Sequence, residues 1–204
     1  MKKLLIISTF IFFIFVSITK AQFKTGDFEL SFSGSFSSMT VESSTTSTYY
    51  NSNPNSDTRS TMDISFSPGY YIADGVSIEA EFGLIAVEKS KPSQYVLLNL
   101  GYTYLVPGSR AALFIHGGYG LANSVEIPYL NNAPVLQSGD FNVKVLNLGA
   151  GVKYLITPNV IIHGEVNYRN HNWTENYSGF FNSNTDYTIS NIGLLFGFSI
   201  LLPK

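Results

Sequence analysis

Near its end the chain reads Asn191-Ile192-Gly193-Leu194-Leu195-Phe196-Gly197-Phe198-Ser199-Ile200-Leu201-Leu202. The even-numbered side chains of this stretch are all large and apolar, whereas the odd-numbered ones are mostly small or polar. Because successive side chains of a strand point to opposite faces, the pattern predicts a strand that separates two media. The bulky face suits lipid, and the small face suits a crowded barrel interior.

Other segments of the chain show the same alternation and are separated by turn-forming or polar residues. The predicted strands cover residues 28–39, 61–72, 76–87, 94–106, 110–122, 141–156 and 160–170, and a last strand begins at Tyr187. A strand of about ten residues tilted by about 40° rises roughly 26 Å, which matches the lipid-facing band of membrane barrels. The sequence therefore predicts an all-β protein, an eight-stranded antiparallel up-and-down transmembrane β-barrel.

The connections between these strands alternate in length. Tight turns are expected at 73–75, 107–109 and 157–159, and long polar loops at 40–60, 123–140 and 171–186, with a short link at 88–93. This asymmetry is typical of outer-membrane barrels, whose short turns lie in the periplasm. We expect a bulge or local break at Pro68, which lacks a backbone donor, and a bulge near Val143 and Val145, where the alternation changes parity.

Aromatic residues are expected to form two rings at the membrane interfaces, where Tyr and Trp are favoured. The ring at the turn end would hold Phe28, Tyr70, Tyr102, Tyr104, Tyr154 and Phe198. The ring at the other end would hold Phe36, Tyr95, Tyr119, Tyr168, Trp173 and Tyr187.

The terminal stretch also carries a sequence signal. Asn191, Gly193, Phe196 and Phe198 resemble the C-terminal assembly signal of bacterial outer-membrane β-barrels, although this chain continues to Lys204. The whole pattern resembles the small eight-stranded family of the OmpA/OmpX type. The resemblance implies a monomeric, multi-pass protein of the Gram-negative cell outer membrane. Its implied partners are the outer-membrane assembly machinery, outer-membrane lipid and lipopolysaccharide, and an extracellular ligand whose identity stays open.

The N-terminus predicts export from the cytoplasm. Met1-Lys2-Lys3 is followed by an apolar run at residues 4–18 and by Ala21, a small residue at a suitable cleavage point. The run is shorter than the roughly 20 residues of a spanning helix, so a signal peptide over 1–21 is favoured over an anchor. The barrel domain would then cover 22–204. The chain has 0 cysteines, which excludes disulfides and a lipoprotein anchor.

Polar residues on the predicted inward faces form the candidate site. They are Glu29, Asp63, Glu79, Glu81, His116, Lys153, His163, Glu165 and Arg169. An eight-stranded barrel is just wide enough for side chains to fill it, and a buried charge needs a partner. We expect these residues to form a polar plug, with a proton or ion path or an acid/base pair as the alternative.

Other site classes lack the necessary residue patterns. His116, His163 and His171 lack metal-ligand spacing, and no phosphate-binding or G-x-S-x-G motif is present, so neither cofactor, metal nor catalytic residues are expected. The near-neutral charge of −2 gives no reason to expect nucleic acid.

We expect a structural or surface-interaction role through the extracellular loops. Three alternatives remain: a narrow porin-like channel, an outer-leaflet lipid-modifying enzyme, and a secreted lipocalin-like barrel. The nearest catalytic set for the enzyme, expected in a loop, is His171 with Glu175 and Ser178. The lipocalin reading conflicts with the polar face expected inside.

Overall fold

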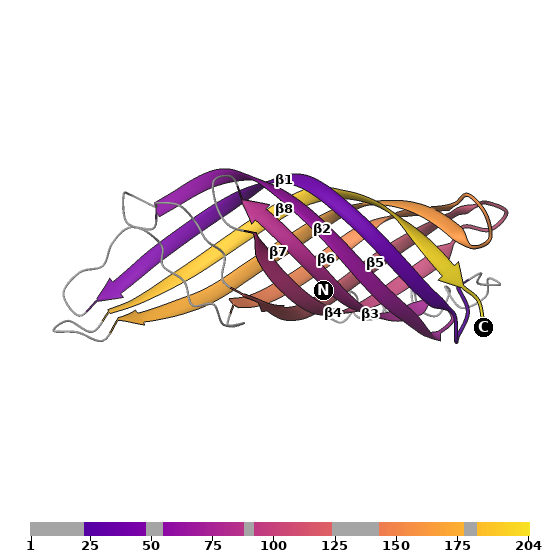
Figure 1. Cartoon of the computed structure of the whole chain (residues 1–204), viewed down its shortest axis with the longest axis horizontal. Helices are drawn as coiled ribbons and strands as arrows, with labels where there is room; N and C mark the ends of the chain where they lie inside the picture. Colours follow the sequence, from indigo (N-terminus) through magenta and orange to yellow (C-terminus); the bar gives the residue numbers. More distant parts are fainter. Residues whose placement is uncertain (1–22, 48–54, 88–91, 124–142, 178–182) are drawn as a thin grey trace, which may run out of the picture.

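The chain forms a closed barrel of eight strands, each hydrogen-bonded to its neighbours in sequence (Figure 1). The computed structural model describes residues 23–47, 55–87, 92–123, 143–177 and 183–204. The strands are β1 Phe28–Ser47, β2 Asn55–Ala73, β3 Val76–Val87, β4 Ser93–Leu105, β5 Ala111–Ala122, β6 Val143–Leu155, β7 Val160–Tyr177 and β8 Ser183–Leu202. The predicted number and order of the strands are confirmed.

Antiparallel pairing between β1 and β8 closes the barrel, from Phe28 opposite Leu202 to Ser47 opposite Ser183. Closure removes the unpaired sheet edge that could not persist in hydrocarbon, because every backbone donor and acceptor there needs a partner. Among the described residues, no helix is long and apolar enough to cross a membrane.

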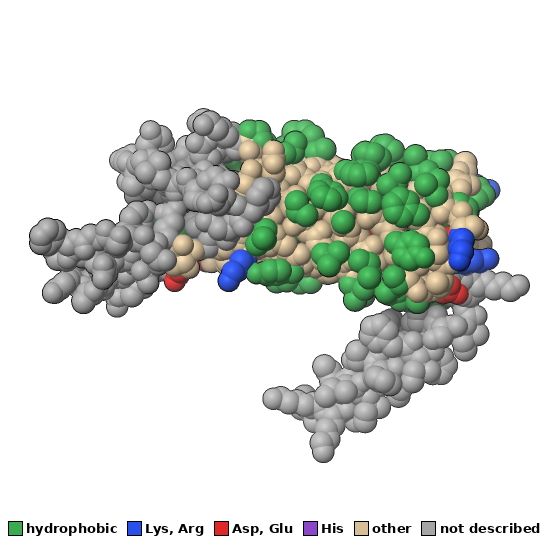
Figure 2. All heavy atoms as spheres, turned by 60° about the horizontal axis from the view of Figure 1, so that its bottom comes forward, with side chains coloured by type: hydrophobic (Ala, Val, Ile, Leu, Met, Phe, Trp, Pro, Cys, Tyr) green, Lys and Arg blue, Asp and Glu red, His purple; other side chains and the backbone are tan. Residues whose placement is uncertain are grey.

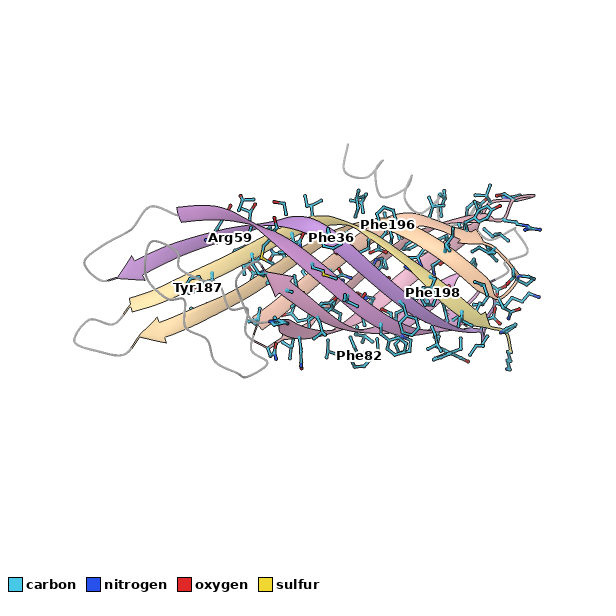
Figure 3. All side chains as sticks on the ribbon, turned by 45° about the horizontal axis from the view of Figure 1, so that its top comes forward. Phe36, Arg59, Phe82, Tyr187, Phe196 and Phe198 are labelled. Carbon is cyan, nitrogen blue, oxygen red and sulfur yellow. The ribbon has the colours of Figure 1, made fainter. Side chains whose placement is uncertain are left out.

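Large apolar side chains are exposed on the outside of the barrel, and Figure 2 shows them on one face between its two ends. Phe82, Leu98 and Phe196 are 47%, 62% and 66% exposed, and the rings of Phe82 and Phe196 point away from the barrel axis (Figure 3). Charged side chains in the same view of Figure 2 lie near the ends of this apolar band. The exterior therefore fits hydrocarbon as its solvent, and it does not fit a lipocalin-like barrel, whose apolar face lines the interior.

Short turns connect β2 to β3, β4 to β5 and β6 to β7, as predicted; we refer to this end of the barrel as the turn end. Gly75 has a φ of 76°, in the region that only glycine adopts readily. A Cβ at this position would lie 2.5 Å from the carbonyl oxygen of Thr103, so close approach also requires glycine there. The described chain ends meet at the turn end, where the Lys204 backbone amide donates to Asp27.

Four strands are longer than the sequence predicted. β1, β2, β7 and β8 continue through much of the predicted loops 40–60 and 171–186, and we call residues 40–47, 55–60, 171–177 and 183–190 the projecting sheet. The loop prediction was wrong for residues 40–47, 55–60, 171–177 and 183–186, because strand pairing does not require an apolar face where no lipid is present. Hydrogen bonds between polar side chains link the paired strands there instead, as where Thr174 donates to the Asp186 carboxylate and Thr188 to the Asn172 amide oxygen. Residues 124–140 of the middle predicted loop lie outside the described residues.

One of the two predicted strand irregularities is present. The pairing of β2 with β3 passes from Phe66–Phe82 to Gly69–Glu79 in one register, so the local break expected at Pro68 is confirmed, without a bulge. The register shift occurs between Tyr71 and Ala73, beside the turn.

The bulge predicted near the start of β6 was wrong. Its pairing with β5 is continuous from Val143 to Tyr154, and Val143 and Val145 point into the barrel. Their apolar character reflects an apolar layer inside the barrel rather than a change of face.

Two aromatic residues that were predicted for the ring at the end opposite the turns lie inside the barrel instead. Tyr95 is 1% exposed and Tyr187 is 9% exposed. Both have the parity of the inward face, and their preference for interfaces was given too much weight. Tyr119, 53% exposed, and Phe36, 78% exposed, do lie outside, whereas the side chain of Trp173 lies outside the described part.

Candidate functional site

Several of the large polar side chains inside the barrel lie against a glycine of an adjacent strand. A Cβ at Gly83 would lie 2.2 Å from the Tyr95 hydroxyl, and one at Gly149 would lie 2.0 Å from Nε2 of His116. These inward glycines thus provide the volume that the phenol and imidazole rings occupy.

An ion pair lies near the turn end. Lys153 Nζ is 2.8 Å from both carboxylate oxygens of Glu29, and the Tyr71 hydroxyl donates to the same carboxylate at 2.7 Å. The ammonium also lies over the rings of Phe23 and Phe114, at 5.5 and 5.2 Å from their centroids. The charge of each partner is therefore balanced in a region that excludes water.

A second polar cluster lies farther from the turns. The Arg169 guanidinium donates to both Asp63 and Glu81, and its carbon lies 4.5 Å from the centroid of the Tyr95 ring. The Tyr95 hydroxyl oxygen lies 2.8 and 3.0 Å from oxygens of the same two carboxylates, which share its single proton. Asn99 donates to Glu81 at 2.9 Å, which continues the cluster toward β4. One arginine and one phenol thus connect two acids from neighbouring strands.

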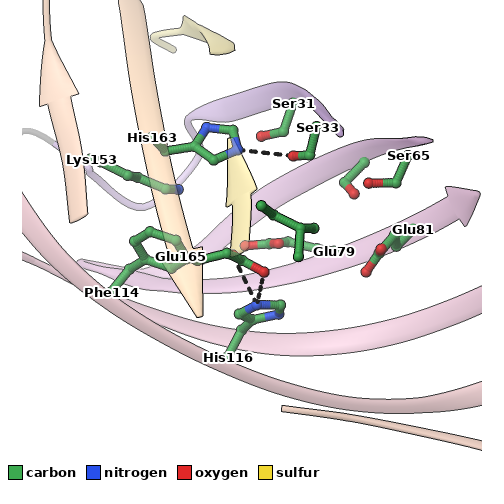
Figure 4. A pocket seen from close by; sticks show the side chains of 12 residues that line it. Ser31, Ser33, Ser65, Glu79, Glu81, Phe114, His116, Lys153, His163 and Glu165 are labelled. Carbon is green, nitrogen blue, oxygen red and sulfur yellow. Dashed lines mark hydrogen bonds and ion pairs between the residues drawn. The ribbon is translucent and has the colours of Figure 1, made fainter. Parts of the chain in front are cut away.

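A small cavity separates the two clusters (Figure 4). It offers about 40 Å³ for the centres of water molecules, which is room for a few waters and not for an organic substrate. On one side, the two ring nitrogens of His163 lie 2.9 Å from Ser33 Oγ and 3.2 Å from Ser199 Oγ. On the other side, Nε2 of His116 is 3.2 Å from the Glu165 carboxylate.

Apolar layers lie inside the barrel at both ends of the polar region. At the turn end, Phe23, Tyr71, Ala112, Leu155, Ile161 and Leu201 pack together with 3% exposure or less. Toward the other end, Tyr95, Leu97, Ala122, Val143 and Val145 form a second cluster with 2% exposure or less. Side chains this well packed are not in contact with solvent, so the described interior lacks the wide aqueous lumen of a general porin.

The structure places all nine sequence-predicted site residues inside the barrel and sorts them into groups. Lys153 joins Glu29, Arg169 joins Asp63 and Glu81, and His116 joins Glu165. His163 and Glu79 stand apart from these ion pairs, since both bond to serine hydroxyls, with Ser77 donating to Glu79 at 2.6 Å. The role of this set as a plug remains a prediction.

Sequence reasoning missed two phenols that hold the clusters together. Tyr71 and Tyr95 each donate to a buried carboxylate. Both tyrosines have odd numbers, as do the inward residues Asp63 and Asn99 on the same strands. This shared parity was the signal that could have placed the two phenols inside the barrel. The Asn99–Asn147–Asn167 chain of amide hydrogen bonds, at 3.1 and 3.0 Å, also could not be anticipated, because it crosses strands distant in sequence.

Of the suggested enzyme site, only His171 has a side chain that the structure describes. It lies on β7 with 0% exposure, not in a loop, and neither of its ring nitrogens has a hydrogen-bond partner among the described residues. The side chains of Glu175 and Ser178 lie outside the described residues. Within the described ranges, no group of three or more His, Cys, Asp or Glu residues is arranged to hold a metal ion.

The residues of the predicted assembly signal lie on both faces of β8. Phe196 and Phe198 point outward and are 66% and 49% exposed, whereas Asn191 is buried inside. Its recognition by the assembly machinery stays a prediction.

A closed antiparallel barrel with an apolar exterior and a filled polar interior defines a small transmembrane β-barrel protein. The chain belongs to the family of the outer membrane protein beta-barrel domain, whose model matches residues 8–199. Its place is accordingly the outer membrane of a Gram-negative cell, which it crosses with its eight strands.

Several solved structures are similar to this chain. OprG from Pseudomonas aeruginosa is 15% identical, with a TM-score of 0.55, over 91% of this chain and 100% of that chain. Neisserial surface protein A is 17% identical, with a TM-score of 0.49, over 86% of this chain and 98% of that chain. At such identities the likeness concerns the fold alone. No curated protein sequence matches the chain significantly.

Proposed function

We propose that this outer-membrane barrel is a non-enzymatic surface protein whose projecting sheet is the interaction surface. The supporting observation is the difference in strand length: β1 and β8 have 20 residues each, whereas β3 and β5 have 12. Twenty residues tilted by about 40° rise roughly 50 Å, about twice the apolar band of a membrane barrel. The excess length is therefore available outside the lipid.

The composition of the projecting sheet supports contact with an aqueous partner. Glu42, Thr58, Asn172, Thr174 and Asp186 are exposed there, and the hydrogen bond between Thr174 and Asp186 fixes these two side chains in place. A preorganised polar surface loses little conformational entropy when it binds. In the proposed orientation the tight turns face the periplasm and this sheet faces the surroundings of the cell.

The small interior cavity and the two apolar layers favour this function over the channel alternative. The bonding of the interior charges to one another favours it over an enzyme acting inside the barrel. The proposed partner of the projecting sheet is an extracellular molecule. Membrane lipid and lipopolysaccharide are the proposed surroundings of the barrel wall.

Shortening the projecting sheet tests the proposal. A variant that joins Met39 to Arg59, two residues that already pair across β1 and β2, removes the tip of one hairpin and leaves the apolar band unchanged. Cells displaying the full chain should aggregate or adhere to protein-coated surfaces more than cells displaying the shortened chain. Heat-modifiable migration on a gel checks that both barrels are folded. Equal adhesion by the two strains, above that of cells lacking the protein, would contradict the proposal.

A further inference from the structure

A short segment before β1 closes the barrel interior at the turn end, and we call its residues 23–27 the strap. Its first residue, Phe23, is 0% exposed, and its ring centroid lies 5.5 Å from that of Tyr71. Phe23 belongs to the apolar layer at this end, together with inward residues of β2, β5, β6, β7 and β8. Within this layer only Phe23 lies outside a strand, so the closure at the turn end includes one removable member.

The strap folds back over the turn end at Gly26. The Asp27 amide donates to the Lys24 carbonyl at 3.0 Å, which closes a tight turn, and Gly26, the third residue of this turn, has a φ of 97°. The Asp27 carboxylate accepts from the Lys24 and Lys204 amides, at 2.8 and 3.2 Å. Glycine adopts many backbone conformations without strain, so Gly26 is the residue about which the strap can swing.

Few bonds hold the strap beyond this turn. The Gly75 amide donates to the first carbonyl of the strap at 2.9 Å, and the Gly26 amide donates to a carbonyl of β2 at 2.8 Å. The amide and hydroxyl of Thr25 donate to the Asp74 carboxylate at 3.0 and 3.1 Å, and both bonds are exposed to water. β1, in contrast, pairs with β2 on one side and β8 on the other. Chain ends with few buried contacts open locally more readily than paired strands, so the strap should open while the barrel stays folded.

Lys153 connects the strap with the interior cavity. Its ammonium lies 5.5 Å from the centroid of the Phe23 ring, and the same side chain lines the cavity. Its partner Glu29 is 2.8 Å away. Water solvates a charged pair, whereas an apolar layer excludes it. Withdrawal of Phe23 would therefore expose the ion pair, and with it the cavity, to water at the turn end.

We propose that the strap is a lid that opens about Gly26 and then admits water from the turn end to the Lys153–Glu29 pair and the cavity behind it. The second apolar layer and the Arg169 cluster stay closed, so the open state is a chamber with one entrance and not a channel. The lid lies at the opposite end of the barrel from the projecting sheet and is independent of what that sheet binds.

Cysteine labelling of the full chain, folded in detergent micelles, tests the lid, because the sequence has 0 cysteines. Ala112→Cys places a thiol in the apolar layer at the turn end, at a position that is 0% exposed. The reagent is sulfonatoethyl methanethiosulfonate, whose charge keeps it in water. Asp74→Ala removes both hydrogen bonds from Thr25 and should raise the labelling rate of this thiol severalfold. Phe23→Ala should raise the rate at least tenfold.

Ala122→Cys is the matched control, because Ala122 is also on β5 and 0% exposed but belongs to the second apolar layer. Its labelling should stay equally slow in all strap backgrounds, and heat-modifiable migration checks the folding of each variant. A rate at Ala112→Cys that is unchanged by Asp74→Ala or by Phe23→Ala would overturn the proposal, as would a parallel rise at Ala122→Cys. None of these results depends on the adhesion of cells that tests the projecting sheet.

Discussion

Lys153 connects opposite parts of the sequence through one contact with Glu29, 124 residues away along the chain. Removing the ammonium leaves a carboxylate in a region that excludes water, bonded by neutral hydroxyls such as those of Tyr71 and Ser31. A buried charge that loses its partner typically costs about 3–5 kcal/mol. We expect Lys153→Met to lower the free energy of unfolding by about this amount, measured by urea titration in lipid vesicles.

The double variant Lys153→Met/Glu29→Gln is the control. A neutral amide needs less solvation than a carboxylate, so the double variant should recover a large part of the lost stability. If it is as unstable as the single variant, packing of the lysine chain against Phe23 and Phe114, and not charge, accounts for the loss.

Asp74 at the turn end gives a prediction on pH. The Thr25 amide and hydroxyl donate to its carboxylate at 3.0 and 3.1 Å, and these bonds hold the pKa of Asp74 below its usual value. Because the folded pKa is depressed, the attachment is complete above the usual range of an aspartate and is lost as pH falls through the lowered value. Amide exchange at Thr25, followed by NMR, should therefore accelerate in acid beyond its intrinsic pH dependence.

Asp74→Asn supplies the comparison for this titration. The amide oxygen can still accept from Thr25 but does not titrate, so only intrinsic exchange chemistry should vary with pH in this variant. The same additional acceleration in both proteins would assign the acid response to another group.

The inward position of single polar residues could be predicted from sequence, but their partners could not. Alternation alone places Arg169 and Lys153 inside, because each shares parity with small or polar neighbours. Which carboxylates they meet depends on the register of the whole closed barrel, which no local pattern contains. His171 was assigned to a loop because the apolar alternation ends before it, whereas the strand that carries it continues past the lipid.

For each strand, the alternation of apolar residues predicted the segment in contact with lipid but not the full length of the strand. β3 was predicted with the bounds that the structure has, Val76–Val87, because it ends near the limit of the apolar band. β1 extends to Ser47, well past its predicted end at Met39, through a segment that consists mostly of serine and threonine. Hydrophobic periodicity carries no signal there, although backbone pairing continues.

The difference between the apolar segment of a strand and its full length predicts where the membrane boundary lies. Leu98 is outward-facing, 62% exposed and central in β4, so Leu98→Arg should cost about 2–4 kcal/mol, the cost of arginine at the bilayer midplane. Thr58→Arg, on the exposed part of β2 in the projecting sheet, should cost less than about 1 kcal/mol. Urea unfolding in vesicles measures both, and similar costs for the two changes would mean that Thr58 lies in lipid.

For the whole molecule, closure of the sheet and filling of its interior are two consequences of the same small circumference. With eight strands, the inward side chains meet across the axis, so ion pairs such as Lys153–Glu29 link strands that are not neighbours in the sheet. The two apolar layers enclose this polar region from both ends. The barrel therefore has its polar core inside and its apolar surface outside, the reverse of a soluble protein.

Such an interior should not conduct ions. Reconstituted in planar bilayers, the protein should show no discrete conductance steps, because a cavity with about 40 Å³ of room for water centres is enclosed by apolar layers and by the Arg169 cluster. Phe23→Ala, which opens only the layer at the turn end, should also be silent, since the other closures remain. Stable steps in the wild type would show that the interior rearranges into a water path. If those steps changed with Arg169→Gln, the path would pass the guanidinium; if they did not, it would have to bypass the cluster.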